Sequence, residues 1–252
     1  MKKSFLNHSN PLLTVMLQCR TPEVAISRIR NANCMGADAY GLQVETLNPE
    51  FQNPDTYKKL FAEMQGRPCY VTNYRYAFNQ NFTDDELADG IVSLAESGAT
   101  LCDVMGDIFC KHPEELTDND AAIQKQMKLI EKLHSLGAEV LMSSHLYKYA
   151  PAERVLEIAL EQKRRGADII KIVTAADTME QQIENLRTTN LLKQELGAPF
   201  LFLSGGVSTI HRRLGIKLGC CMALCVCEHD ELSTASQPLL SIMKTIRDNI
   251  DF

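Results

Sequence analysis

Residues 166–174 read GADIIKIVT, a stretch that joins a helix stop to a short buried strand. A glycine such as Gly166 often ends a helix, because it readily adopts the left-handed backbone of a C-cap. The apolar run that follows is typical of a parallel strand covered on both faces. Lys171 stands inside this run, between Ile170 and Ile172. Among aliphatic side chains an ammonium loses solvation, so we expect a lowered pKa and a neutral amine that attacks a carbonyl.

The same alternation of apolar runs and helical patterns extends over the chain. Helical spacing covers residues 118–136 and 151–165, and similar patterns cover 177–191 and 236–249. Eight short apolar runs alternating with helices predict a single α/β domain over residues 1–252, a (β/α)8 TIM barrel. The alternative is an open doubly wound sheet, but no glycine-rich dinucleotide motif follows an early strand. The predicted strands are residues 12–19, 37–44, 69–74, 100–105, 139–144, 168–173, 199–204 and 222–227.

Composition restricts the class of partner. The 252 residues match the size of one such barrel, and the formal net charge is −6. An acidic chain is not expected to bind nucleic acid, since that binding depends on neutralising phosphates. No run approaches the roughly 18 apolar residues of a membrane span. The N-terminal stretch, residues 1–17, is interpreted as leading into a first strand rather than as a signal peptide. We therefore expect a cytoplasmic protein that does not associate with membranes and acts on a small molecule.

Nine cysteines are scattered along the chain, and the odd count does not suggest a secreted disulfide framework. Four of them lie in CCMALCVC, residues 220–227. Zinc ligation by this group is one interpretation. The apolar residues between the thiols favour the other, which is small buried side chains in the last barrel strand. We predict no metal site here.

Active sites of such barrels lie at the carboxyl ends of the strands. The candidates for chemistry there are Arg75, Asp103, His145, Lys171, Ser204 and, after the eighth strand, Ser233 and Gln237. The run AEVLMSSH, residues 138–145, ends in His145, on the strand before Lys171. An imidazole near a lysine that forms an imine could shuttle protons at neutral pH. Arg213, in HRRLG after the seventh strand, could hold a carboxylate through two hydrogen bonds. Arg212 is adjacent, and the sequence alone does not decide between the two.

In their order and spacing, these pieces resemble the type I 3-dehydroquinate dehydratases of the shikimate pathway and aromatic amino acid biosynthesis. The resemblance covers most of the chain and is best after residue 137. It rests on VTNYR (71–75), LMSSH (141–145), GADIIKIVTAADTMEQ (166–181), HRRL (211–214) and STASQ (233–237). It implies a catalytic pair of Lys171, which forms the Schiff base (imine), and His145. The substrate-binding residues that it implies are Arg75, Arg213, Ser233 and Gln237.

Other positions depart from the family pattern. The Glu-x-Arg pair that ends the family's second strand is matched here by Gly41 and Gln43, so Gln43 is the remaining candidate for substrate binding on that strand. The family's glutamate partner of the histidine is matched by Asn79, and the strand-four glutamate by Met105. The imine and carboxylate ends of the site are therefore expected to be intact, while the side that binds ring hydroxyls is rebuilt.

The resemblance implies a lyase that eliminates water from a cyclic keto-acid through a lysine imine, without a metal or organic cofactor. The substrate is expected to be 3-dehydroquinate or a relative that lacks a hydroxyl. One alternative is a lysine-imine aldolase on the same fold, and another is a non-catalytic relative that binds a keto-acid. A homodimer is the expected association, because many such barrels pair through their outer helices.

Overall fold

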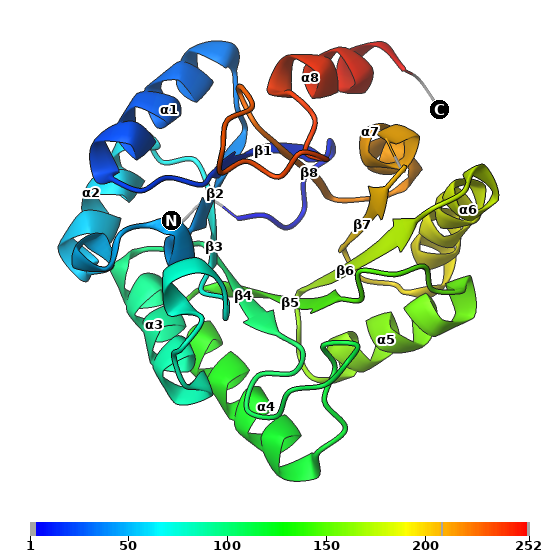
Figure 1. Ribbon diagram of the computed structural model, residues 1–252, viewed down its shortest axis with the longest axis horizontal. Helices are drawn as coiled ribbons and strands as arrows, with labels where there is room; N and C mark the ends of the chain where they lie inside the picture. Colours follow the sequence, from blue (N-terminus) through cyan, green and yellow to red (C-terminus); the bar gives the residue numbers. More distant parts are fainter. Residues whose placement is uncertain (1–3, 208, 251–252) are drawn as a thin grey trace.

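The computed structural model describes residues 4–207 and 209–250, and these form a nearly closed parallel barrel surrounded by helices (Figure 1). The prediction of a single-domain (β/α)8 barrel is confirmed. The strands are β1 Leu12–Leu17, β2 Ala39–Gln43, β3 Cys69–Thr72, β4 Leu101–Met105, β5 Glu139–His145, β6 Ile169–Ala176, β7 Phe200–Gly206 and β8 Met222–Cys225. The α-helices are α1 Pro22–Met35, α2 Pro54–Glu63, α3 Asp84–Ser97, α4 Asp120–Ser135, α5 Ala152–Arg164, α6 Met179–Glu195, α7 Thr209–Leu218 and α8 Leu240–Asn249.

The strands pair in chain order from β1 to β7, and β8 pairs with β1 on the other side. At the remaining seam, the backbone N–H of Cys221 donates to the carbonyl of Phe200 over 2.9 Å. This bond ties the entry of β8 to the start of β7, so the barrel closes at the amino ends of its strands. In the β5–β6 register, Ser143 is opposite Lys171 and His145 is opposite Val173.

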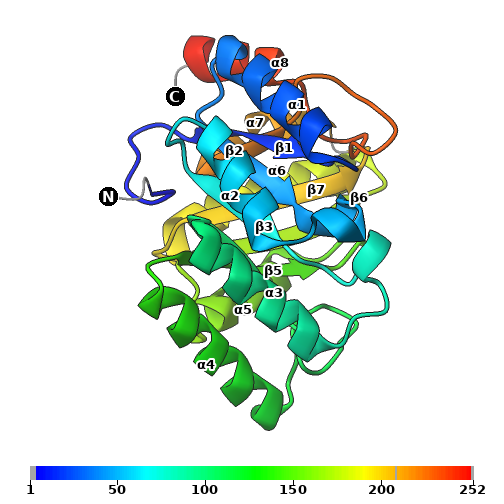
Figure 2. The same cartoon turned by 90° about the vertical axis from the view of Figure 1, so that its left-hand side faces the viewer.

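The N-terminal segment covers the amino end of the barrel, away from the carboxyl ends of the strands (Figure 2). Phe5 is buried with the residues of the barrel interior, and its backbone N–H donates to the Glu139 carboxylate over 2.8 Å. Ser4 binds the same carboxylate. Phe5 therefore packs against the interior residues at the amino end of the barrel, opposite the carboxyl ends of the strands.

Local signals fix where the helices begin and end. Thr83 and Glu86 form a reciprocal capping box at the start of α3. Gly36 and Gly98 end α1 and α3 in the left-handed conformation, and Gly166 has a φ of 100° between α5 and β6. These turns return the chain to the barrel directly after each helix.

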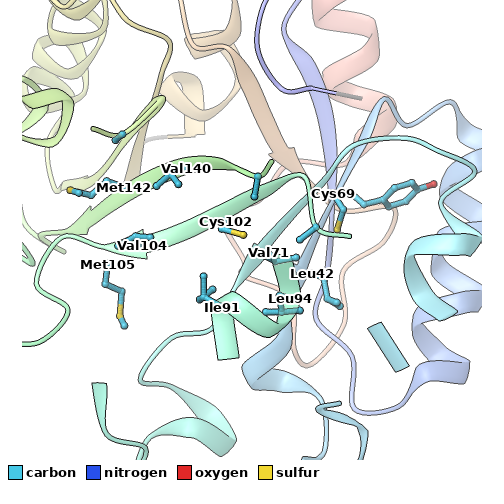
Figure 3. Close-up of a cluster of buried hydrophobic side chains, with 14 of the residues drawn as sticks. Leu42, Cys69, Val71, Ile91, Leu94, Cys102, Val104, Met105, Val140 and Met142 are labelled. Carbon is cyan, nitrogen blue, oxygen red and sulfur yellow. The ribbon is translucent and has the colours of Figure 1, made fainter. Parts of the chain in front are cut away.

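The buried side chains form two layers, one inside the barrel and one between the strands and the helices. Figure 3 shows part of the outer layer, where Leu42 and Val71 of β2 and β3 lie near Leu94 of α3. Ile170 and Ile172 belong to this outer layer, whereas Ile169 and Val173 belong to the interior. Side chains alternate along a strand, so Lys171 shares the interior face with Ile169 and Val173.

The cysteine-rich stretch around β8 is largely buried, with Cys220 and Cys225 in the core. Burial raises the pKa of both thiols. Among the described residues, no group of three His, Cys, Asp or Glu side chains is arranged to hold a metal ion. Nor is any helix in residues 4–207 and 209–250 long and apolar enough to cross a bilayer.

Candidate active site

A cavity of about 440 Å³ lies at the carboxyl ends of the strands. This size is within the usual range of small-molecule sites. Five of the seven predicted site residues line it, and two, Arg213 and Ser233, do not. The five are Gln43, Arg75, His145, Lys171 and Gln237.

The Lys171 side chain lies inside the barrel, with 5% of its surface exposed. Its Nζ is 2.6 Å from the Tyr74 hydroxyl, 3.0 Å from the Tyr70 hydroxyl and 3.1 Å from Asp103 Oδ2. The expectation that aliphatic side chains surround the amine is therefore wrong. The neighbouring Ile170 and Ile172 point outward to the helices, and the inward face presents polar groups from β3 and β4 instead.

The Asp103 carboxylate is fully buried and receives hydrogen bonds on both oxygens. The Ser143 hydroxyl donates to Oδ1 over 2.6 Å, and the hydroxyls of Tyr70 and Tyr74 both donate to Oδ2. Burial and the nearby carboxylate raise the pKa of both phenols well above the ordinary value, so they remain protonated donors at neutral pH. These hydrogen bonds offset much of the free energy that is needed to desolvate the two charges of the buried ion pair.

His145 lies at the end of β5 with a carboxylate partner that the sequence analysis did not identify. Its Nδ1 is 2.6 Å from Glu115 Oε2, and its backbone N–H donates to the same oxygen over 2.9 Å. A carboxylate at this place favours a ring hydrogen on Nδ1, so Nε2 is the ring nitrogen directed away from Glu115. The ring stacks on Tyr147 and meets the edge of Tyr74, with centroids 5.7 and 5.4 Å away.

Glu115 comes from the loop between β4 and α4, where its φ of 44° is unusual for a residue with a side chain. The Ser144 hydroxyl donates to its carbonyl over 2.7 Å. A Cβ built at Gly106 would lie 2.4 Å from this carbonyl, so Gly106 leaves the space in which the loop folds back toward His145. Glu115 of this loop thus gives His145 a carboxylate partner, which Asn79, at the position of the family's glutamate, cannot provide.

Of the two adjacent arginines on α7, Arg212 lines the cavity and Arg213 does not. Successive residues of a helix point about 100° apart, so only one of the two can face the barrel mouth. Arg213 donates to the carbonyl of Thr209 on its own helix. The Nε of Arg212 donates to the Ser204 carbonyl over 2.7 Å, and no carboxylate among the described residues pairs with it. Desolvation lowers the pKa of Arg212 to about 10.

Arg75 lines the cavity, but its charge is already neutralised. Its guanidinium lies 2.6 Å from Asp84 and 2.8 Å from Asp107. Gln43 also lines the cavity and donates to Glu45 over 3.2 Å. These two predicted ligand-binding residues are therefore held by acidic side chains of the protein.

The segment after β8 contributes Gln237 to the cavity, but not Ser233. The Ser233 hydroxyl donates to the carbonyl of Asp230 over 2.9 Å and so stabilises its own turn. Gln237 Oε1 and Gln18 Oε1 are buried without a hydrogen-bond partner among the described residues. Such unpaired amide oxygens on the cavity wall favour a polar ligand.

The positions that depart from the family pattern do not restore its polar groups. Asn79 is buried, donates to Asn73 over 2.6 Å and does not line the cavity. Met105 lines the cavity next to Arg75. A Cβ built at Gly41 would lie 2.3 Å from the Met16 sulfur and 3.1 Å from the Tyr70 ring. Tyr70 and Met16 therefore occupy space that a longer side chain at position 41 would need.

The sequence profile of a family described as type I 3-dehydroquinase matches residues 13–248. The chain belongs to the type I 3-dehydroquinase family. Membership of this family indicates a hydro-lyase of the 3-dehydroquinate dehydratase type. A sequence search of curated proteins finds no match.

Solved dehydroquinase structures share the fold at low sequence identity. The Geobacillus kaustophilus 3-dehydroquinate dehydratase has a TM-score of 0.81 at 16% identity, covering 95% of this chain and 91% of its own. The Clostridium difficile type I enzyme, with covalently modified comenic acid, has a TM-score of 0.80 at 15% identity, covering 96% and 92%. The Aquifex aeolicus dehydratase has a TM-score of 0.71 at 19% identity, covering 94% and 97%.

Proposed function

We propose that this dehydroquinase-family protein is a lysine-imine hydro-lyase that eliminates water from a cyclic β-hydroxy keto-acid. The main support is that the Lys171 amine and the His145 ring line one cavity, with Tyr74 touching both. Lys171 attacks the ketone and forms a protonated imine. The imine then withdraws electrons from the adjacent C–H bond.

His145 acts on that C–H bond as the base. Its Nε2 accepts the proton, and Glu115 stabilises the imidazolium that forms. The ring then returns a proton to the departing β-hydroxyl, which leaves as water. Hydrolysis of the imine releases an α,β-unsaturated product and regenerates Lys171.

Arg212 is the proposed carboxylate-binding residue in place of Arg213. It lines the cavity without a carboxylate partner in the described part of the chain, whereas Arg75 already binds two. Arg20 also lines the cavity but is exposed and lies over the Phe78 ring, 5.0 Å from its centroid. A guanidinium that is desolvated and unpaired gains most from an anionic ligand.

We further propose that the substrate has fewer ring hydroxyls than 3-dehydroquinate. The family's Glu-x-Arg pair is absent, and Gly41 and Met105 offer no side chain that binds a hydroxyl. Hydrogen bonds to charged groups contribute roughly 1.5 to 3 kcal/mol each. Losing two such bonds weakens transition-state binding of a polyhydroxylated ring by a factor of about 10² or more.

The imine is tested by borohydride reduction in the presence of 3-dehydroquinate. A mass increase on the peptide that contains Lys171, absent in Lys171→Met, supports the mechanism. An unmodified Lys171 at saturating ligand rejects it. Thermal stabilisation by the ligand without turnover would then favour the keto-acid-binding alternative, and two product fragments would favour the aldolase.

The substrate is tested by comparing two keto-acids for the ultraviolet absorbance of the enone product. The first is 3-dehydroquinate and the second is 1-hydroxy-3-oxocyclohexane-1-carboxylate, which keeps only the leaving hydroxyl. We expect kcat/KM for the second compound to equal or exceed that for the first. A family-typical preference for 3-dehydroquinate would reject the altered substrate and leave the imine mechanism standing.

A further inference from the structure

The Lys171 amine contacts groups that have no role in the reaction steps proposed above. Tyr70 and Tyr74 on and just after β3, together with Asp103 on β4, all lie within 3.1 Å of Nζ. The two hydroxyls also donate to Asp103 Oδ2, so each of them bridges the amine and the carboxylate. The four groups form one hydrogen-bonded cluster at the floor of the cavity.

Imine formation from a lysine that is paired with a carboxylate requires a proton to move twice. The ammonium must lose a proton before nitrogen can attack, and the carbinolamine oxygen must gain one before it leaves as water. His145 is held by Glu115, and no contact joins it to Lys171 within residues 4–207 and 209–250. Asp103 is the buried group that directly faces the amine.

We propose that Asp103 and Tyr74 form the proton path for imine formation at Lys171, a role that rests on the proposed imine mechanism. Asp103 takes one proton from the ammonium, and the neutral amine forms the C–N bond. The nitrogen proton passes to the former carbonyl oxygen, giving a carbinolamine. Tyr74 then donates its hydroxyl proton to that oxygen and regains one from protonated Asp103. The C–O bond breaks, water leaves, and the iminium and the carboxylate remain.

Tyr74 rather than Tyr70 is the donor because of where the two rings lie. Tyr70 is fully buried on β3, whereas Tyr74 follows the strand and is partly exposed to the cavity. Tyr74 also makes the shorter contact with Nζ, 2.6 Å against 3.0 Å, and its ring meets His145. Tyr74 thus lies between the groups that act on the C–N and C–H bonds, while Tyr70 helps to hold Asp103.

The test follows imine formation alone, using 3-oxocyclohexane-1-carboxylate, which has the ketone and the carboxylate but no hydroxyl to eliminate. Borohydride quenching at successive times gives the rate at which the adduct on Lys171 forms. Tyr74→Phe should slow this rate by about 10²-fold, the loss expected for a general acid. Tyr57→Phe is the matched control, since it removes a phenol hydroxyl from a buried ring on α2, outside the site, and should not change the rate.

Packing and proton transfer are separated by a second variant. Tyr74→Ala leaves space for a small ring, so added phenol should restore the rate of adduct formation, whereas added toluene should not. Equal rescue by toluene would overturn the proposal, as would a Tyr74→Phe rate equal to that of the unchanged protein. Failure of the unchanged protein to form any adduct would instead reject the imine mechanism itself.

Discussion

The two adjacent arginines of α7 allow a direct test of the carboxylate site, with one as the control for the other. Arg212→Met keeps the aliphatic stem and removes the guanidinium that lines the cavity. Arg213→Met makes the same change one residue later, where the side chain donates to the Thr209 carbonyl and to no other group in residues 4–207 and 209–250. We expect Arg212→Met, but not Arg213→Met, to lose recognition of the ligand carboxylate.

The magnitude follows from the hydrogen bonds that the ligand would lose. A two-pronged contact between a guanidinium and a carboxylate is worth about 3 kcal/mol or more, taking roughly 1.5 to 3 kcal/mol for each charge-assisted bond. Each 1.4 kcal/mol corresponds to about a factor of ten, so the affinity should fall by about 10². Arg212→Lys should show an intermediate loss, because it keeps the charge and loses the planar fork.

The assay is calorimetric binding of 3-oxocyclohexane-1-carboxylate and of the corresponding carboxamide. The unchanged protein and Arg213→Met should prefer the carboxylate by about 10², while Arg212→Met should bind both compounds alike. A preference that survives in Arg212→Met, or disappears in Arg213→Met, would refute the assignment of the carboxylate to Arg212.

Three further predictions concern other residues in and around the site. Burial raises the pKa of Glu45 from 4.5 to about 7. The stability that protonated Glu45 contributes is therefore complete below pH 4.5 and is lost as the pH rises through 7. In urea unfolding, Glu45→Gln should remove about 3 kcal/mol of this pH dependence. Lys171→Met and Asp103→Asn should each lower the free energy of unfolding, measured in urea, by about 3 kcal/mol. The double variant should lose about 2 kcal/mol less than the sum of the two single losses, and additive losses would show that the two groups are not coupled. Glu115→Gln should lower kcat by about 10² or more with an unchanged fold by circular dichroism, because His145 loses control of its tautomer; an unchanged kcat would exclude this role.

The fold was predictable because its signals are local. Each strand is a short apolar run, and the strand predicted over residues 168–173 overlaps β6, which begins at Ile169 and extends to Ala176. Glycine marks the end of several helices, as at Gly166. Lys171 and His145 could be placed at the barrel mouth for the same reason, since neighbouring parallel strands end at the same face.

The tyrosine and glutamate partners of these two residues were not predictable, because they come from elements distant in sequence. Tyr70 is 101 residues from Lys171, and Glu115 is 30 residues from His145. Glu115 lies in a loop whose path depends on a positive φ, which its residue type does not indicate. The choice between Arg212 and Arg213 depended on where α7 begins, and an error of one residue there turns a side chain by about 100°.

The rebuilt side of the barrel explains why losing the family's strand-two glutamate has left a well-packed site. Gly41 has no side chain, and the space that a Cβ would need is occupied by the Met16 sulfur and the Tyr70 ring. The sulfur is the end of a flexible chain and could move aside, but the Tyr70 ring is fixed by its hydrogen bonds to Asp103 and Lys171. A side chain at position 41 would therefore need the end of Met16 to move and the Tyr70 ring to shift by a few tenths of an ångström, against the hydrogen bonds that hold this ring beside the Lys171 amine. Glycine at position 41 and the tyrosine cluster are thus linked by packing, and we expect a side chain added at position 41 to disturb the phenol of Tyr70 that contacts Lys171.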